Sequence, residues 1–141
     1  SFKVSDAHGS NFKGANLADV KTDKSDFSKS DFTKADLTNA QLRMTNLDGV
    51  TFNDTNLTNT DFSHSDIHGV SFEGQTLVGT VFSNMSKKSL KGVSFKNATL
   101  RSVSFHHSDA KEAAFDGATM DKLTYASLKG TRADLTNVTV I

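Results

Sequence analysis

Histidine, aspartate and serine are the residues of this sequence that could carry out chemistry. Histidine beside carboxylates could bind a metal ion or transfer protons, and serine beside histidine and aspartate could act as a nucleophile. Each of these functions requires the side chains to converge on one point, so the elements that position them decide whether the chemistry is available. The five histidines are His8, His64, His68, His106 and His107.

Length and composition restrict the class of protein. The chain has 141 residues, of which 35% are apolar, and this length predicts a single domain with a small core. The 16 basic residues balance the 16 acidic ones, so no net field attracts nucleic acid or an anionic membrane. Cysteine is absent, which excludes disulfides and thiolate metal sites, and no apolar run is long enough to span a membrane. Because the chain begins at Ser1 rather than Met, we expect a processed chain or a piece of a longer protein.

Large apolar residues recur at every fifth position, a period that fits neither an α-helix nor a β-strand. The stretch Ser25–Gly49 reads SDFSK SDFTK ADLTN AQLRM TNLDG when it is divided into fives. The pattern begins at Phe2, breaks at Lys87 and resumes three residues out of phase at Leu90. All 11 phenylalanines occupy the central positions of these units, so the repeat decides the fold.

This pattern resembles the pentapeptide-repeat family, whose units hold a small residue, Asp or Asn, Leu or Phe, and then two polar or small residues. The units Ala35–Asn39 and Ala133–Asn137 match it at every position, and the resemblance covers essentially the whole chain. It implies an all-β fold, a right-handed, four-sided parallel β-helix of about seven coils with four units in each coil. The departures are Ala7, Thr22 and Ala110 at central positions and Gln75 where a small residue is expected.

Two pure columns of side chains support four units per coil. If every fourth centre stacks on one face, one column is all Phe and the next all Leu, provided that three extra residues between Ser83 and Ser89 loop out. Like side chains stacked about 4.8 Å apart pack without gaps. We therefore predict one repeat domain over residues 1–141, with a looped-out insertion at 83–89. The predicted core columns are Phe12, Phe32, Phe52, Phe72, Phe95 and Phe115, and Leu17, Leu37, Leu57, Leu77 and Leu100.

Glycines mark the turns, and one of them marks an irregularity. Most lie at the fifth position of a unit, where a type II turn needs a positive φ. Gly130 does not, but a unit drawn over residues 126–130 places Leu128 inside and Gly130 at the turn. We therefore predict a local irregularity at 123–132. The small first position also faces inward, so Gln75 there needs a hydrogen-bond partner or must swing outward.

On this fold the candidate catalytic and metal-binding side chains do not converge. All five histidines take outward positions, and His64 and His107 share a face but lie two coils, about 10 Å, apart, which is too far for one metal ion. For the adjacent His106 and His107, a solvated pair is the alternative to a metal site. A rod filled with its own Phe and Leu has no pocket to exclude water. We therefore predict a non-enzymatic protein with no catalytic residue, metal or cofactor.

Two charged features could contact a partner. An acidic column along one face could imitate the spaced phosphates of duplex DNA, or its carboxylates could simply accept local hydrogen bonds in the turns. Lysines on the same face dilute its field. The looped-out corner would project as a basic knob, and a neutral face of Asn and Thr offers a flat surface. The candidate partner contacts are Asp6, Asp26, Asp66, Lys87 and Lys88.

These features predict a structural or protein-interaction module, a rigid rod that presents flat faces and a corner loop to a protein partner. The alternative is a DNA-mimicking protein that interacts with topoisomerase, as the quinolone-resistance branch of the resembling family implies. Those mimics are strongly acidic and pair through a C-terminal element, whereas this chain has zero net charge and no predicted helix near Val138–Ile141. We expect no direct nucleic-acid or membrane partner. Either a homodimer forms through the apolar C-terminal end, or further residues cover it.

Overall fold

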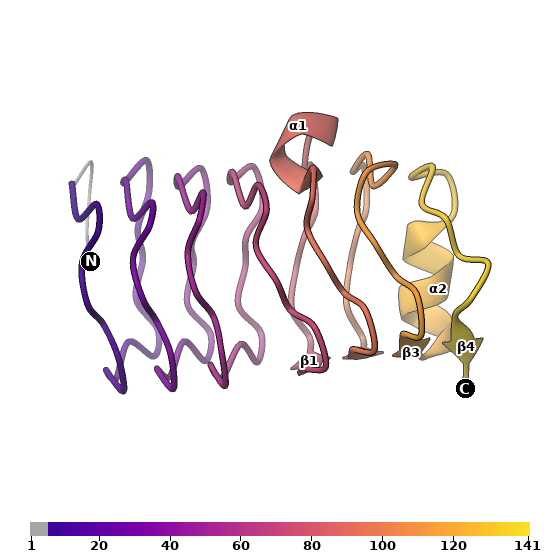
Figure 1. Cartoon of the computed structure of the whole chain (residues 1–141), viewed down its shortest axis with the longest axis horizontal. Coiled ribbons are helices and arrows are strands. Elements are labelled where there is room, and N and C mark those ends of the chain that lie inside the picture. Colours follow the sequence, from indigo (N-terminus) through magenta and orange to yellow (C-terminus); the bar gives the residue numbers. More distant parts are fainter. Residues whose placement is uncertain (1–5) are drawn as a thin grey trace.

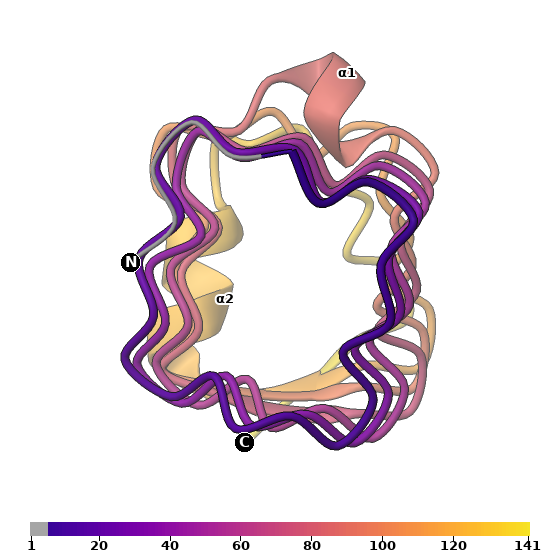
Figure 2. The same cartoon turned by 90° about the vertical axis from the view of Figure 1, so that its left-hand side faces the viewer.

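The chain forms a right-handed, four-sided parallel β-helix, so the predicted fold class is confirmed. The computed structural model describes residues 6–141, and Phe2 lies outside them. Figure 1 shows the coils stacked along the rod, and Figure 2, which looks along its axis, shows that they superpose as four walls. Each wall is one unit long, so most coils pair through single residues such as Asn16 with Asp36 and Asp36 with Asn56.

The regular elements are short and few. Four strands lie on one wall, at the bottom of Figure 1, and pair in parallel in the order β1-β2-β3-β4. Two helices interrupt the coils, α1 at the top of Figure 1 and α2 in the last coil. The elements are β1 (Thr76–Val78), α1 (Lys87–Leu90), β2 (Thr99–Arg101), β3 (Thr119–Met120), α2 (Lys122–Leu128) and β4 (Thr139–Val140).

The core is made of stacked Phe and Leu columns. Rings follow one another from coil to coil, for example Phe32 on Phe52 with centroids 5.5 Å apart and Phe95 on Phe115 at 5.1 Å. Nine of the eleven predicted column residues are buried, and each of the nine is at most 2% exposed. The other two, Phe12 and Leu17, are half-buried because they lie in the first described coil, at the end of the rod.

The turns show why the second and fifth positions of each unit are restricted. The fifth position adopts positive φ throughout most of the rod, for example +66° at Gly79 and +61° at Lys34. At Gly79 a Cβ would lie 2.1 Å from Asn59 Oδ1, so a side chain there would require the Asn59 amide to move. The second position accepts a hydrogen bond from the N–H two residues later, as Asp36 does from Thr38 at 3.0 Å.

A ladder of buried hydroxyl groups lies inside the rod, and it was not predicted from the sequence. Serine or threonine at the first position of a unit donates to the carbonyl of a central residue in the preceding coil. Thr55 donates to Phe32 at 2.7 Å and Thr80 to Leu57 at 2.8 Å. Gln75 finds the partner that its position requires, since its amide nitrogen donates to the Phe52 carbonyl at 2.7 Å.

The phase break in the sequence corresponds to α1. Leu77 pairs with Leu100 across the break and Leu100 pairs with Met120 after it, so the columns pass beneath α1 without a shift. Met85 remains part of the coil, since it is 2% exposed and its N–H donates to Ser108 Oγ at 2.9 Å. The residues that leave the coil are therefore Ser86–Lys88, a shorter segment than the predicted 83–89.

Within the stretch 123–132 the chain forms part of α2, a helix that was not predicted, whereas the segment Val138–Ile141 contains β4 and no helix, as expected. α2 takes the place of a whole wall in the last coil (Figure 2) and buries Leu128 at 1% exposure. In a regular coil, backbone carbonyls accept hydrogen bonds from N–H groups of the preceding coil. In α2, side-chain hydroxyl groups accept these bonds instead. Val103 N–H donates to Thr124 Oγ1 at 3.0 Å and Phe105 N–H to Ser127 Oγ at 3.1 Å.

Candidate partner-binding surfaces

The acidic column exists, but its carboxylates act within the turns. Asp6 pairs with Asp26, and Asn46 bridges Asp26 to Asp66. Asp26 accepts from Ser28 N at 2.8 Å and Asp66 from His68 N at 3.0 Å. Hydrogen bonds from the Ser28 side chain and backbone hold the pKa of Asp26 below its ordinary value. The local hydrogen bonds expected from the repeat therefore account for this column without a ligand.

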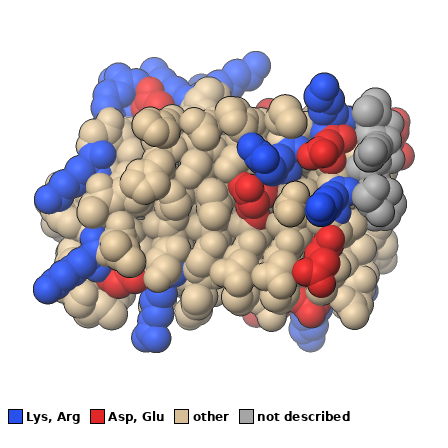
Figure 3. Space-filling view, turned by 180° about the vertical axis from the view of Figure 1, so that it is seen from behind, with Lys and Arg blue, Asp and Glu red and all other residues tan. Residues whose placement is uncertain are grey.

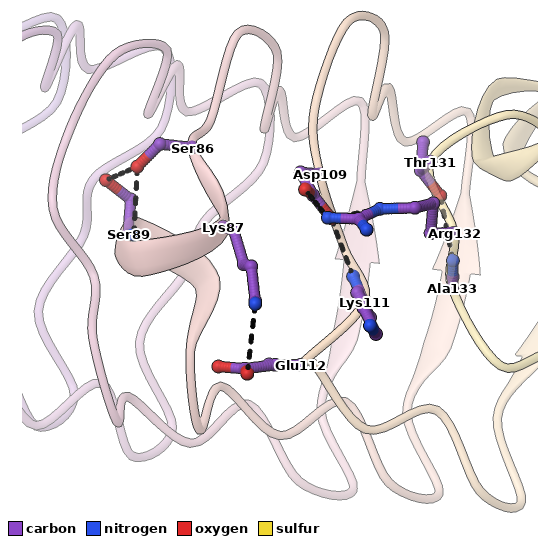
Figure 4. A network of polar contacts seen from close by, with 9 residues as sticks. All are labelled: Ser86, Lys87, Ser89, Asp109, Lys111, Glu112, Thr131, Arg132 and Ala133. Carbon is purple, nitrogen blue, oxygen red and sulfur yellow. Dashed lines mark hydrogen bonds and ion pairs between the residues drawn. The ribbon is translucent and has the colours of Figure 1, made fainter.

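The corner at α1 carries the predicted basic residues, and one of them is paired. Ser86 caps the helix by accepting from Ser89 N, and Leu90 anchors its end in the core. Lys87 Nζ lies 3.6 Å from Glu112 Oε1 (Figure 4), so Lys87 is not a free charge. Lys88 is exposed and forms no ion pair within residues 6–141.

A second ion pair lies beside the first and was missed from the sequence. Arg132 Nε donates to Asp109 Oδ1 at 3.3 Å, and a second guanidinium nitrogen contacts Oδ2 (Figure 4). This hydrogen bond lowers the pKa of Asp109 and raises that of Arg132. Arg132 lies in the irregular stretch, where the phase of the repeat gives no position. We call Lys87, Lys88, Glu112, Asp109 and Arg132 the α1 cluster.

One wall carries few charges, and part of a second wall is uncharged. The wall that holds β1–β4 presents threonines in register, Thr76 with Thr99 and Thr99 with Thr119. Its N-terminal part is the neutral face predicted from the sequence, with residues such as Thr38 and Asn56. Seen from behind, the rod shows a broad band without Lys, Arg, Asp or Glu (Figure 3). Such flat walls suit shape-based contact more than electrostatic contact.

The histidines do not form a site. All five are exposed, and His8 and His68 contact single partners, Ser28 Oγ at 2.9 Å and Asp48 Oδ1 at 3.2 Å. In the described part of the chain, no group of three or more His, Cys, Asp or Glu side chains could hold a metal ion. Across the same residues, neither helix has the length and apolarity needed to cross a membrane.

Sequence families recognise the same repeat on both sides of α1. A model described as "Pentapeptide repeat region" matches residues 5–82, and a model of eight pentapeptide repeats matches residues 89–122. The chain belongs to the pentapeptide-repeat family. The two matches stop and resume around the segment that leaves the coil to form α1. Among curated proteins, none matches this pentapeptide-repeat chain closely enough to indicate common descent.

Solved pentapeptide-repeat proteins are similar to this chain in fold. Full-length QnrB1, a plasmid-mediated fluoroquinolone resistance protein, is 13% identical and superposes with a TM-score of 0.55, covering 99% of this chain and 92% of its own. A pentapeptide repeat protein from the Arabidopsis thaliana thylakoid lumen is 21% identical over 81% of this chain and 67% of its own, with a TM-score of 0.46. Rfr23 from the cyanobacterium Cyanothece 51142 is 20% identical over 86% of this chain and 88% of its own, with a TM-score of 0.44.

Proposed function

We propose that this pentapeptide-repeat rod is a non-enzymatic protein-interaction module and that the α1 cluster contacts its partner. One observation carries the proposal: Ser86–Lys88, at the start of α1, are exposed and project from a coil whose register continues beneath them. The fold does not need Ser86–Lys88, because Met85 and Ser89 already occupy neighbouring positions of the coil. A protruding segment with exposed lysines that adds nothing to the core is a surface suited to recognition.

The charge of the α1 cluster favours a partner with an acidic patch. Lys87 and Arg132 are each matched by a carboxylate at the surface, whereas Lys88 is free to pair with a partner's carboxylate. Lys111, whose N–H donates to Asp109, lies beside them and is exposed. Charges at the edge of a contact steer association and choose between partners more than they add affinity.

A test compares partner capture by the natural chain with that by Lys88→Glu. Chemical cross-linking and mass spectrometry should identify a protein cross-linked near α1 whose yield falls at least tenfold in Lys88→Glu. Lys96→Glu makes the same charge change on a different wall and should leave the yield unchanged. Equal cross-linking yields from all three proteins would contradict the assignment of the partner site to α1.

The DNA-mimic alternative is separated from this proposal by a supercoiling assay. Asn46 interrupts the acidic column, and local donors engage its carboxylates. The likeness to QnrB1 is one of fold alone. A mimic needs a dense negative field, so we expect no inhibition of a type II topoisomerase at micromolar rod. Potent, salt-sensitive inhibition would instead make Asp6, Asp26 and Asp66 the working surface.

A further inference from the structure

One interface between coils is open on the wall of the Phe12–Phe115 column. In a regular interface the N–H groups of central and fifth residues donate to carbonyls of the next coil, as Phe32 does to Thr51 and Lys34 to Asn53. The equivalent bonds from Phe52 and Asp54 to the coil that contains Ser71 and Glu73 are missing, although both segments are described. We call the interface between residues 51–57 and 71–76 the open seam.

The interfaces on both sides of the open seam are closed. On one side, Leu37 N donates to the Asn56 carbonyl at 2.9 Å. On the other, Phe72 N donates to Ser94 at 2.8 Å and Gly74 N to Lys96 at 2.9 Å. Figure 1 shows a wider step between the coil that precedes β1 and β1 itself than between the earlier coils. The opening is therefore local to one interface.

Gln75 gives the physical cause of the opening. It occupies the first position of its unit, where Thr55, Thr60 and Thr80 bridge coils through a short hydroxyl group. Gln75 makes the same bridge to Phe52 with a longer side chain and remains half-buried. In the core the widening is small: the ring centroids of Phe52 and Phe72 are 5.8 Å apart, against 5.5 Å for Phe32 and Phe52 and 5.2 Å for Phe72 and Phe95. A longer bridge holds the two coils apart where a threonine would let them close.

The open seam forms a groove on the surface. Its volume is about 680 Å³, within the range of about 300–1,000 Å³ that ligand sites occupy. It is lined by polar side chains, among them Asn53, Asp54 and Glu73. Neither carboxylate forms an ion pair within residues 6–141. Lys34 and Lys96 lie one coil away on either side, outside the groove.

The groove offers the groups that an extended polypeptide needs. Among residues 6–141 the N–H groups of Phe52, Asp54 and Leu57 have no acceptor, and the matching carbonyls of the next coil receive nothing from them. Backbone donors and acceptors left at the edge of a ladder are the usual template for adding a strand. The unpaired carboxylates of Asp54 and Glu73 beside them would attract a basic side chain.

We propose that the open seam binds an extended segment of a protein partner, which pairs with the free backbone groups and places a lysine or arginine against Asp54 and Glu73. The proposal rests on the function proposed above, since it requires a protein-interaction rod, but it adds a second contact site on a different wall from α1.

The first test measures the seam in the free protein. In hydrogen exchange followed by NMR, the amides of Asp54 and Leu57 should exchange at least tenfold faster than those of Lys34 and Leu37, their equivalents in the closed interface. Gln75→Thr should remove this difference. The variant is expected to fold, because threonine occupies the same position in neighbouring units. Equal protection of the four amides in the natural chain would overturn the proposal.

The second test measures binding. A phage library of random twelve-residue peptides is selected on the natural chain, and chosen peptides are titrated by fluorescence anisotropy. We expect basic peptides whose affinity falls at least tenfold in Gln75→Thr and several-fold in Asp54→Asn with Glu73→Gln. Asp116→Asn, on the same wall but outside the seam, should leave affinity unchanged. Failure to enrich such peptides, or binders indifferent to Gln75→Thr, would overturn the proposal.

The two proposals fail separately. A partner whose capture depends on Lys88 but not on Gln75 would contradict the proposal for the open seam and support the contact at α1. A partner that depends on Gln75 but not on Lys88 would do the reverse.

Discussion

The two helices interrupt the coil in opposite ways. The start of α1 lies outside the wall, and the coil beneath keeps its pairing from Leu77 to Leu100. α2 replaces the wall itself, so its side chains must supply what the coil no longer does: Leu128 fills the core, and Thr124 accepts a backbone N–H of the preceding coil. Residues added to a coil cost little, whereas residues exchanged for a wall must reproduce both its packing and its hydrogen bonds.

The largest difference in stability is expected between two three-residue deletions, one at each helix. Removing Ser86–Lys88 restores unbroken fives and should leave the free energy of unfolding within about 1 kcal/mol of the natural chain, because only a surface segment and an exposed ion pair are lost. Removing Thr124–Ala126 should cost more than about 4 kcal/mol, since it takes a buried threonine out of the wall. Guanidinium denaturation followed by circular dichroism measures both, and similar losses would contradict the distinction between the helices.

The second-largest difference in stability is expected between the two leucines of α2, Leu128, which faces the core, and Leu123, which faces solvent. Leu128→Ala should lower the free energy of unfolding by about 2–5 kcal/mol, because it leaves a cavity under the wall. Leu123→Ala is the matched control, since Leu123 is 71% exposed and should change stability by less than about 0.5 kcal/mol. The same denaturation experiment applies, and a large loss at Leu123 would mean that α2 faces the core differently.

The helix caps should differ in their response to acid. Burial acts to raise the pKa of Asp121, but hydrogen bonds from Thr124 and Ser102 outweigh it, so its pKa is lowered from 3.8. Its stabilising effect is therefore complete above pH 3.8 and is lost as the pH falls through the lower folded value. Asp121→Ala should cost about 1 kcal/mol at pH 7 and progressively less below pH 3.8, relative to the natural chain.

Ser86→Ala is the control for the acid response, because a serine cap carries no charge. Its cost should be smaller, as α1 lies outside the wall, and should not change between pH 7 and pH 3. Urea titrations of each variant and the natural chain at both pH values supply the comparison. A pH-independent cost at Asp121 would show that its charge does not contribute to the cap.

The ion pair at α1 should have the smallest effect on stability. Lys87 and Glu112 are both exposed, and their side chains approach at 3.6 Å. Surface pairs of this kind contribute about 0–1 kcal/mol. A double-mutant cycle of Lys87→Ala and Glu112→Ala should therefore give a coupling below about 1 kcal/mol, which falls further in 0.5 M salt. A larger, salt-insensitive coupling would make α1 part of the fold rather than an addition to it.

The same contrast explains what the sequence could predict. The Phe column and the break before Leu90 were readable because one side chain per unit enters the core at a fixed period. Leu128 and Gly130 indicated the irregularity at 123–132, but a local change of phase does not distinguish a bulged coil from a short helix, so α2 itself was not predicted. Gln75 was recognised as a misfit at its position. Whether the two coils close or separate around it depends on the length of its side chain relative to the spacing of the backbone hydrogen bonds between coils, which the sequence does not show. Arg132 and Asp109 meet only because α2 changes the path of the last coil.

The hydroxyl ladder makes the two ends of the rod chemically different. In Thr55, Thr60 and Thr80 the donor belongs to the later coil and the acceptor to the earlier one. A coil therefore offers carbonyls to the coil that follows it and hydroxyl groups to the coil that precedes it. The ladder has a polarity along the rod axis, so a second rod could extend it only when stacked head to tail.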